Sequence, residues 1–196
     1  MKSSPLLLET VKIENGEVFN LPYHQKRCNR SRKELFGLEE KLDLSKYITD
    51  IPSQGLYRCR IIYGEALHTV EYLPYLPKEI NSLRIVPSTI DYHYKYLYRD
   101  DFNTLLKKNS DVDEILIEKE GLLTDTTISN IALYDGKTWF TPRIPLLKGT
   151  MRAKLIDEGF LKTRDITKKE LSNYSQVALI NAMIGFKILN HFKIQM

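Results

Sequence analysis

The chain has 196 residues, of which 42% are hydrophobic and 28% are charged, a composition typical of a globular protein with a buried core. Its formal net charge is +4, and the basic residues are spread along the sequence. A protein that binds duplex nucleic acid usually has a broad basic face, so this charge pattern does not favour one. Cys28 and Cys59 give neither a metal-ligand spacing nor a disulfide framework, so we expect a protein of the reducing cytoplasm. No apolar run approaches the roughly 20 residues that a membrane helix needs.

The first half of the chain predicts a small α+β domain. Asn15-Gly16 is a strong signal for a tight β-hairpin, and Gly37 follows a helical stretch as a typical helix terminator. The expected elements are strands at residues 6–12 and 17–21, a helix from Pro22 to about Phe36, and strands at residues 56–63 and 68–75.

The stretch YLPYLPKE, residues 72–79, contains two prolines three positions apart and is typical of an extended connector. We place the domain boundary there, which gives domains at residues 1–76 and 77–196. Closely spaced strands dominate the second domain, which favours an antiparallel or mixed sheet with helices at its flanks. Its expected elements are strands at residues 83–90, 114–118, 122–123, 129–134, 137–141 and 176–183, helices at 97–107 and 150–157, and a capping box at Thr167 and Glu170.

Residues 92–99, YHYKYLYR, place one lysine, Lys95, among four tyrosines. This unusual setting makes Lys95 the first candidate for a functional residue. Lys95 lies where an extended segment meets the predicted helix, a junction at which a side chain can face a pocket. One interpretation is an ordinary exposed charge on a tyrosine-rich strand. The other is an amine made nucleophilic by desolvation and nearby cations.

Three other features carry chemistry. His24, Arg27 and Ser31 share one face of the first helix, where Arg27 can bind a phosphate through two nitrogens. Gly149 and Thr150 open a later helix, whose unpaired amides and dipole suit an anion.

Asp125 and Asn130 lie in LTDTTISNIAL, at the start of a strand pair. Taken singly, Asp125 is more often a turn residue, and His24 and Asn130 are more often structural hydrogen-bonding groups. Taken together, a lysine for a Schiff base, a carboxylate for a pyridinium nitrogen and an anion seat for a phosphate are the requirements of pyridoxal 5′-phosphate.

The order of these motifs resembles that of the fold type IV pyridoxal-phosphate enzymes, which include branched-chain and D-amino-acid aminotransferases and aminodeoxychorismate lyase. FNLPYHQKRCNRS resembles the H-x-x-R helix of that family, KYLYR its K-x-x-x-R segment, LLTDTTISNIALYDGKTWFTP its T-E-x-x-x-x-N strand pair, and PLLKGTMR its L-x-G-I-T-R helix start. The resemblance covers most of the chain. It implies a two-domain α+β fold, with Lys95 and most of the cofactor site in the larger C-terminal domain.

The resemblance also implies a role for each matching residue. Lys95 would form the Schiff base and then act as the general base, Asp125 would contact the pyridine nitrogen, and Arg27, Gly149 and Thr150 would bind the phosphate. Asn130 completes the cofactor-binding set. For a substrate carboxylate and the pocket wall, we consider Arg60, Tyr94, Arg99 and Arg143, each of which has a surface or packing interpretation as well.

Four departures from the family pattern stand out. Asp125 replaces the usual glutamate, and Thr150-Met151 replaces the usual Ile-Thr. LINAMIG lies where the family often presents a phosphate-binding threonine, so Asn181 or the Ala182 backbone are the local alternatives. The chain is also shorter than is typical of the family.

The implied activity is that of a pyridoxal-phosphate enzyme acting on an amino acid or similar substrate through an external aldimine. The K-x-x-x-R form and the compact length favour the lyase branch, which releases 4-aminobenzoate and pyruvate. A branched-chain or D-amino-acid aminotransferase and a degenerate cofactor-binding protein without turnover remain alternatives, and a basic nucleic-acid-binding module is a more remote one. We expect a homodimer with no metal, no membrane contact and no nucleic-acid partner.

Overall fold

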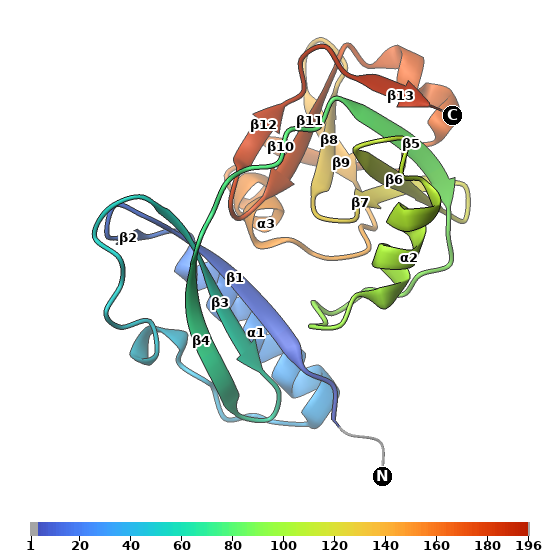
Figure 1. Ribbon diagram of the computed structural model, residues 1–196. Coiled ribbons are helices and arrows are strands. Elements are labelled where there is room, and N and C mark those ends of the chain that lie inside the picture. Colours follow the sequence, from blue (N-terminus) through green and yellow to red (C-terminus); the bar gives the residue numbers. More distant parts are fainter. Residues whose placement is uncertain (1–3, 196) are drawn as a thin grey trace. The chain divides into compact units, whose positions relative to one another are not determined.

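The computed structural model describes residues 4–195, which form two compact units. The first unit extends to Pro77 and also includes Tyr94–Tyr98, while the second comprises Lys78–His93 and the chain from Arg99 onward (Figure 1). The sequence predicts Lys95 in the second domain, whereas the structure groups its segment with the first unit.

The first unit is an antiparallel sheet in the order β2-β1-β3-β4, with α1 on one face (Figure 1). The predicted hairpin is confirmed, since Asn15 and Gly16 turn between the first two strands with φ angles of 49° and 80°. The predicted helix end is confirmed as well, because Gly37 caps α1 with φ 70°. The elements are β1 (Leu7–Glu14), β2 (Glu17–Val18), α1 (Leu21–Phe36), the short 3₁₀ helix η1 (Leu44–Lys46), β3 (Leu56–Tyr63) and β4 (Leu67–Pro74).

Strict alternation along β1 sets the core of this unit. Leu7, Val11 and Ile13 point inward and are fully buried against residues of β3 and α1, among them Cys28. Glu9 occupies the same inward row and is also fully buried. A carboxylate at such a position needs partners, because an unpaired buried charge is very unfavourable.

Backbone pairing with β1 explains why Tyr94–Tyr98 belongs to the first unit. Leu8 N donates to the Lys95 carbonyl at 2.9 Å, and Leu97 N donates to the Leu6 carbonyl at 2.9 Å. These bonds hold residues 95–97 beside the start of β1, so the prediction of a helix from residue 97 is wrong, and the helix starts at Asp100. The predicted start of the connector at residue 72 is too early, because β4 continues to Pro74. β4 is an edge strand, which tolerates the missing N–H of proline.

The second unit is built on a mixed sheet, as predicted. Its strand order is β10-β9-β8-β7-β6-β5-β13, and β11 lies beside β8 and carries β12. β5 pairs in parallel with β6 and β13, and β9 with β10. The elements are β5 (Ser82–Pro87), α2 (Asp100–Lys108), β6 (Glu114–Lys119), β7 (Leu122–Thr126), β8 (Asn130–Tyr134), β9 (Trp139–Pro142), α3 (Thr150–Asp157), β10 (Leu161–Arg164), the 3₁₀ helix η2 (Lys168–Asn173), β11 (Gln176–Asn181), β12 (Gly185–Ile188) and β13 (Lys193–Gln195).

Apolar clusters form the core of this unit. One combines Leu83, Leu116, Ile131 and Leu179 with further side chains of the same strands. Another places Leu155 of α3 against β8 and β11, and so fixes the helix start relative to the sheet. The predicted bounds of α3 are confirmed.

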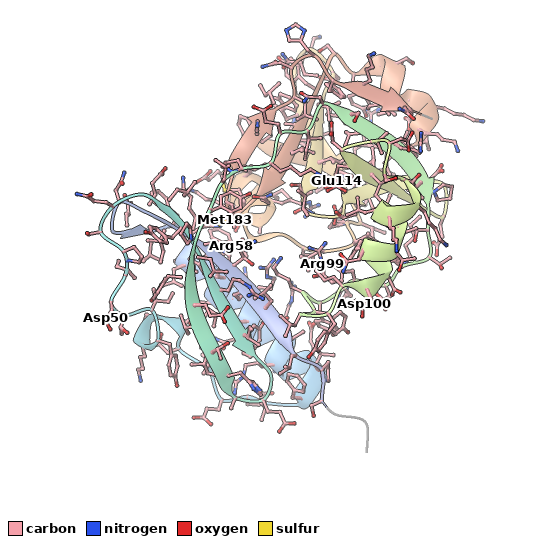
Figure 2. The ribbon with its side chains drawn as sticks, in the orientation of Figure 1. Asp50, Arg58, Arg99, Asp100, Glu114 and Met183 are labelled. Atoms are coloured by element: carbon pink, nitrogen blue, oxygen red, sulfur yellow. The ribbon has the colours of Figure 1, made fainter. Side chains whose placement is uncertain are left out.

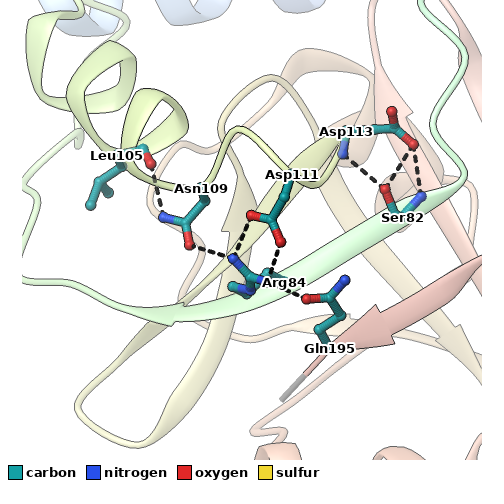
Figure 3. Close-up of polar contacts among 7 residues, drawn as sticks. All are labelled: Ser82, Arg84, Leu105, Asn109, Asp111, Asp113 and Gln195. Carbon is teal, nitrogen blue, oxygen red and sulfur yellow. Dashed lines mark hydrogen bonds and ion pairs between the residues drawn. The ribbon is translucent and has the colours of Figure 1, made fainter.

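Side-chain contacts secure the sheet edge at β5 and β13 (Figure 3). Arg84 binds the Asp111 carboxylate through Nη1 at 2.8 Å and Nη2 at 2.6 Å, and it also contacts Gln195 of β13. Asp113 accepts hydrogen bonds from the Ser82 amide and hydroxyl, both at 2.9 Å. These contacts hold the start of β6 against β5.

Candidate functional site

A buried ionic cluster lies between β1 and α1 in the first unit. The Glu9 carboxylate accepts hydrogen bonds from Arg27 Nε at 2.8 Å and Nη2 at 2.5 Å, and it contacts His24 Nδ1 at 2.6 Å. His24 and Arg27 are adjacent on the predicted face of α1, and this face meets the inward row of β1. Sequence reasoning identified the helical half of the cluster and missed Glu9.

Charge pairing decides the ionisation of this cluster. Burial alone would raise the pKa of Glu9, but the Arg27 charge and the hydrogen bonds from His24 and Arg27 lower it to about 2. The carboxylate therefore only accepts hydrogen bonds, so His24 Nδ1 carries the hydrogen that lies between them. Burial lowers the pKa of His24 despite the contact with Glu9, which leaves its imidazole neutral at pH 7.

Lys95 lies beside this cluster. It is half-buried, and its carbonyl is bound by the amide of Leu8, the neighbour of Glu9. The charge of Lys95 contributes to the lowered pKa of His24, although burial is the main cause. Two of the candidate residues, Arg27 and Lys95, are thus gathered near one strand of the first unit.

Asp125 and Asn130 meet at the β7–β8 junction in the second unit. Asp125 is only 4% exposed; its Oδ1 accepts from Asn130 Nδ2 at 2.8 Å and its Oδ2 accepts from Leu147 N at 2.9 Å. The same Asn130 nitrogen donates to the Leu147 carbonyl at 2.8 Å. Asp125 lies within β7 instead of before a strand, because this strand extends three residues beyond the predicted Leu123.

Burial raises the pKa of Asp125 to about 7, against the opposing effects of the Leu147 amide, Asn130 and the Arg152 charge. Arg152 is buried too, but it donates to Thr141 Oγ1 at 3.2 Å and to the Pro142 carbonyl at 2.8 Å. Within residues 4–195, no cation forms an ion pair with Asp125. The carboxyl can therefore exchange a proton near neutral pH.

The start of α3 lies next to Asn130. Gly149 is the N-cap of α3 and offers no side chain to its first amides. An ideal Cβ on Gly149 would lie 2.0 Å from Asn130 Oδ1, so the close approach of the two residues requires glycine. Thr150, the first helical residue, is buried. The structure thus brings Asp125, Asn130, Gly149 and Thr150 together within the second unit.

The predicted substrate-binding residues have varied surroundings. Arg60 Nη1 pairs with Glu71 at 2.9 Å across β3 and β4, and the exposed Arg143 pairs with Asp165 at 3.1 Å. These pairs agree with the surface interpretation of both arginines. Tyr94 packs edge-on against Tyr96 with ring centroids 6.0 Å apart, and both rings lie against the core of the first unit.

Asn181 was the local alternative for phosphate binding. Its Oδ1 accepts hydrogen bonds from Met183 N at 2.9 Å and Ile184 N at 3.0 Å, while its Nδ2 donates to Ser129 Oγ at 2.9 Å. The side chain is thereby used to shape the turn after β11. The local sequence contains this signal, since asparagine commonly binds the backbone two residues on.

Sequence reasoning also missed Glu9, Arg152 and Glu114, all of which are buried. A charged residue in the inward row of an alternating strand was an available signal for Glu9. Histidine, cysteine and carboxylate side chains do not gather in any group of three or more that could bind a metal ion within residues 4–195. In that part of the chain, every helix is too short or too polar to cross a bilayer.

Comparison with known proteins decides the family. Residues 92–189, half of the chain, match the family model described as amino-transferase class IV. The chain belongs to this family. Membership confirms the resemblance to fold type IV enzymes, the fold class, and the expectation of an enzyme.

The class IV chain has relatives of similar length. It is 37% identical over 185 residues to an uncharacterized protein of Haemophilus influenzae, covering 91% of this chain and 98% of that one. A crystal structure from Haemophilus somnus, provisionally named a 4-amino-4-deoxychorismate lyase, is 36% identical with a TM-score of 0.85 and covers 94% of this chain and 99% of that one. A Schizosaccharomyces pombe protein, provisionally named an aminodeoxychorismate lyase, is 28% identical over 197 residues, with coverages of 90% and 85%.

Proposed function

We propose that this class IV family member binds pyridoxal 5′-phosphate and acts on an amino-acid-like substrate as a 4-amino-4-deoxychorismate lyase. The observation that carries the cofactor proposal is Asp125, a buried carboxyl whose pKa is about 7 and whose hydrogen-bond donors are neutral. Such a group is suited to a cationic ring nitrogen, since a cation there would stabilise the ionised carboxylate.

The residues present fit this cofactor. Oδ1 of Asp125 accepts a hydrogen bond from Asn130 and Oδ2 accepts one from Leu147, and each carboxylate oxygen can accept a second hydrogen bond. Gly149 leaves the amides of the first turn of α3 without a side-chain cap, as a phosphate requires. Arg27 provides a guanidinium already oriented by Glu9.

Pyridoxal phosphate supplies an aldehyde and an electron-withdrawing pyridine ring. Lys95 would hold the cofactor through its amine. The same amine would act as the general base that takes the proton from the substrate α-carbon. Asp125 would hold a proton on the ring nitrogen, and the resulting charge would favour removal of the α-proton.

Arg27 and the backbone amides at Gly149 and Thr150 would bind the phosphate group. A guanidinium binds phosphate through paired N–H groups, and the helix dipole of α3 adds a favourable field. Asn130 can support the site without contacting the cofactor. Its side-chain nitrogen donates both to Asp125 and to the Leu147 carbonyl, and so holds Asp125 beside the loop before α3.

Similarity to the Haemophilus somnus protein supports the lyase assignment, since the identity of 36% extends over 94% of this chain. A lyase of this kind releases 4-aminobenzoate and pyruvate without a second substrate. An aminotransferase instead requires a 2-oxo acid to restore its cofactor. This difference makes the two activities separable in one assay.

The test begins with protein loaded with pyridoxal phosphate and treated with borohydride. Mass analysis of the digest should place the reduced cofactor on the peptide containing Lys95, and Lys95→Ala should abolish the adduct while retaining the fold. Lys137→Ala, an exposed lysine in the turn after β8, serves as the matched control. An adduct that persists in Lys95→Ala would contradict the assignment.

The second stage supplies 4-amino-4-deoxychorismate without any 2-oxo acid. Release of pyruvate and 4-aminobenzoate is the expected result. Strict dependence on an added 2-oxo acid would show an aminotransferase, and cofactor binding without any amine-dependent spectral change would show a degenerate member. We further propose a cytoplasmic homodimer, which light scattering on the loaded protein tests for oligomeric state.

A further inference from the structure

Arg152 is a buried charge in the second unit to which the proposed function gives no role. It lies in the first turn of α3 and is only 6% exposed. A buried guanidinium needs hydrogen-bond partners, because an unsatisfied buried charge is very unfavourable. The other arginines of this unit are half-buried or exposed and are held differently: Arg84 pairs with Asp111, Arg143 pairs with Asp165, Arg99 contacts the Thr127 carbonyl and the rings of Tyr92 and Phe102, and Arg164 lies over the Phe140 ring.

The partners of Arg152 lie at the end of β9. Nε donates to Thr141 Oγ1 at 3.2 Å, and Nη2 donates to the Pro142 carbonyl at 2.8 Å. Thr141 is fully buried, and β9 is held in the sheet because it pairs with β8 and β10. Both acceptors are neutral, so the guanidinium joins two elements of the fold instead of forming an ion pair. Arg152 thereby links the first turn of α3 to a fixed strand.

This link closes the loop between β9 and α3 at its base. The loop comprises residues 143–149, and Arg152 reaches from α3 back to Pro142, the residue before it. Within the loop, Leu147 N donates to Asp125 Oδ2 at 2.9 Å, and the Leu147 carbonyl accepts from Asn130 Nδ2 at 2.8 Å. The loop that supplies a hydrogen bond to Asp125 is thus held at its base by Arg152.

The strand side of Asp125 is fixed without Arg152. The turn that follows β7 contains Thr127, whose hydroxyl donates to both oxygens of Glu114, at 2.8 and 2.9 Å. Glu114 is the first residue of β6, is only 1% exposed and lies inside the second unit (Figure 2). Because this turn is fixed, the contact between Asp125 and Leu147 depends on where the loop before α3 is placed.

Arg152 also acts on Asp125 through its charge. Among charged groups it has the largest effect on the pKa of Asp125, which it lowers, and the hydrogen bonds from Leu147 and Asn130 lower that pKa further. Loss of the Leu147 contact and loss of the Arg152 charge would therefore both raise the pKa of Asp125. A variant that keeps the charge separates the two effects.

We propose that Arg152 is a positioning residue, which holds the Leu147 amide against Asp125 by joining α3 to Thr141 and Pro142. The inference rests on the proposed function, because it concerns the carboxyl assigned there to the ring nitrogen. With this link in place, the loop is ordered before the cofactor binds, so binding does not have to supply the cost of ordering it.

The test measures two properties of the full-length, cofactor-free protein by NMR. These are the hydrogen-exchange rate of the Leu147 amide and the pKa of Asp125, followed by the chemical shift of its carboxyl carbon. Arg152→Lys keeps the positive charge but lacks the planar fork that reaches Thr141 and Pro142 from separate nitrogens. It should raise the Asp125 pKa and accelerate exchange of the Leu147 amide about tenfold, the factor expected for loss of one hydrogen bond to a charged group. Arg152→Gln also removes the charge, so it should raise the pKa further, by about one unit.

The same unit supplies matched controls. The Ser82 amide donates to the Asp113 carboxylate at 2.9 Å, as Leu147 does to Asp125, and should exchange at the wild-type rate in both variants. Arg164→Gln removes an exposed arginine and should leave the Leu147 exchange rate and the Asp125 pKa unchanged.

Thr141→Val removes the acceptor of Nε and keeps both Arg152 and the shape of the side chain. It should accelerate exchange of the Leu147 amide less than Arg152→Lys does, since the contact with the Pro142 carbonyl remains. Melting temperatures verify that each variant is folded. If the arginine variants do not fold, Thr141→Val decides the question, and a wild-type exchange rate at Leu147 then overturns the inference.

Wild-type values of both properties in Arg152→Lys would leave Arg152 with an effect of charge alone and overturn the inference. Equal acceleration at Ser82 and Leu147 would show a general loss of stability and overturn it too. Pyridoxal phosphate is then added to the wild-type protein. An Asp125 signal that does not respond to it contradicts the proposed function, whereas the measurements without cofactor still decide the role of Arg152.

Discussion

Replacing Asp125 with asparagine should remove a pH-dependent part of the stability of the cofactor-free protein. The side chain is 4% exposed, and burial raises its pKa from 3.8 to about 7. Between these pH values the folded state holds a proton that the unfolded chain releases. The stability contributed by that proton is therefore complete below pH 3.8 and is lost as the pH rises through about 7.

The magnitude follows from the same interval. At about 1.4 kcal/mol for each pH unit, the range from 3.8 to about 7 corresponds to about 4 kcal/mol. Asp125→Asn also exchanges an acceptor oxygen for an amino group, which costs about 1–3 kcal/mol in lost hydrogen bonding. This second effect does not depend on pH, so the pH dependence of the difference isolates the titration.

The assay is urea unfolding followed by circular dichroism, repeated from roughly pH 4 to pH 8 for both proteins. The free energy of unfolding of Asp125→Asn, minus that of the wild-type protein, should rise by about 4 kcal/mol across this range. With saturating pyridoxal phosphate, the rise should shrink, because a ring cation stabilises the ionised Asp125.

A difference that stays constant with pH would refute the reasoning about burial, since Asp125 would then titrate at its ordinary value. If the difference in unfolding free energy rises equally with bound cofactor, the Asp125 carboxyl does not contact the ring nitrogen. The first outcome concerns the fold, and the second concerns the proposed site.

Three further predictions concern buried and exposed polar contacts. Glu9→Ala should destabilise the protein by about 3–5 kcal/mol in urea unfolding, because it leaves Arg27 buried without its carboxylate, and a loss below about 1 kcal/mol would contradict the ion-pair argument. Gly149→Ala should lower both the melting temperature and the affinity for pyridoxal phosphate measured by absorbance titration, since the new Cβ displaces Asn130; an unaltered titration would exclude a tight approach there. Arg60→Gln should change the free energy of unfolding by less than about 1 kcal/mol, and a larger change would show that its partly exposed ion pair matters more than such pairs usually do.

The sequence predicted best the features that depend on neighbouring residues. Asn15-Gly16 and Gly37 adopt left-handed backbone conformations that glycine and asparagine favour, and the bounds of α3 follow from its glycine start. Short edge strands were missed. β13 pairs with β5, from which it is separated by most of the sequence of the second unit. The residues next to β13 therefore contain no pattern that predicts this strand.

The same distinction separates the candidate residues. Arg27 was accessible because helical spacing places it beside His24, but its partner Glu9 lies on another element and depends on the packing of α1 against β1. Arg60 and Arg143 were equivalent in the sequence to Arg99. Only the positions of Glu71 and Asp165 distinguish them, and these depend on strand register and on a distant loop.

The return of Tyr94–Tyr98 to the first unit has a consequence for synthesis on the ribosome. When the polypeptide has been made only as far as Pro77, Leu8 N and the Leu6 carbonyl still lack the partners that Lys95 and Leu97 provide. That edge of the nascent sheet stays open until translation has passed Tyr98, and an open edge invites pairing with other chains. Completion of the N-terminal unit and placement of Lys95 therefore depend on the same late stage of synthesis.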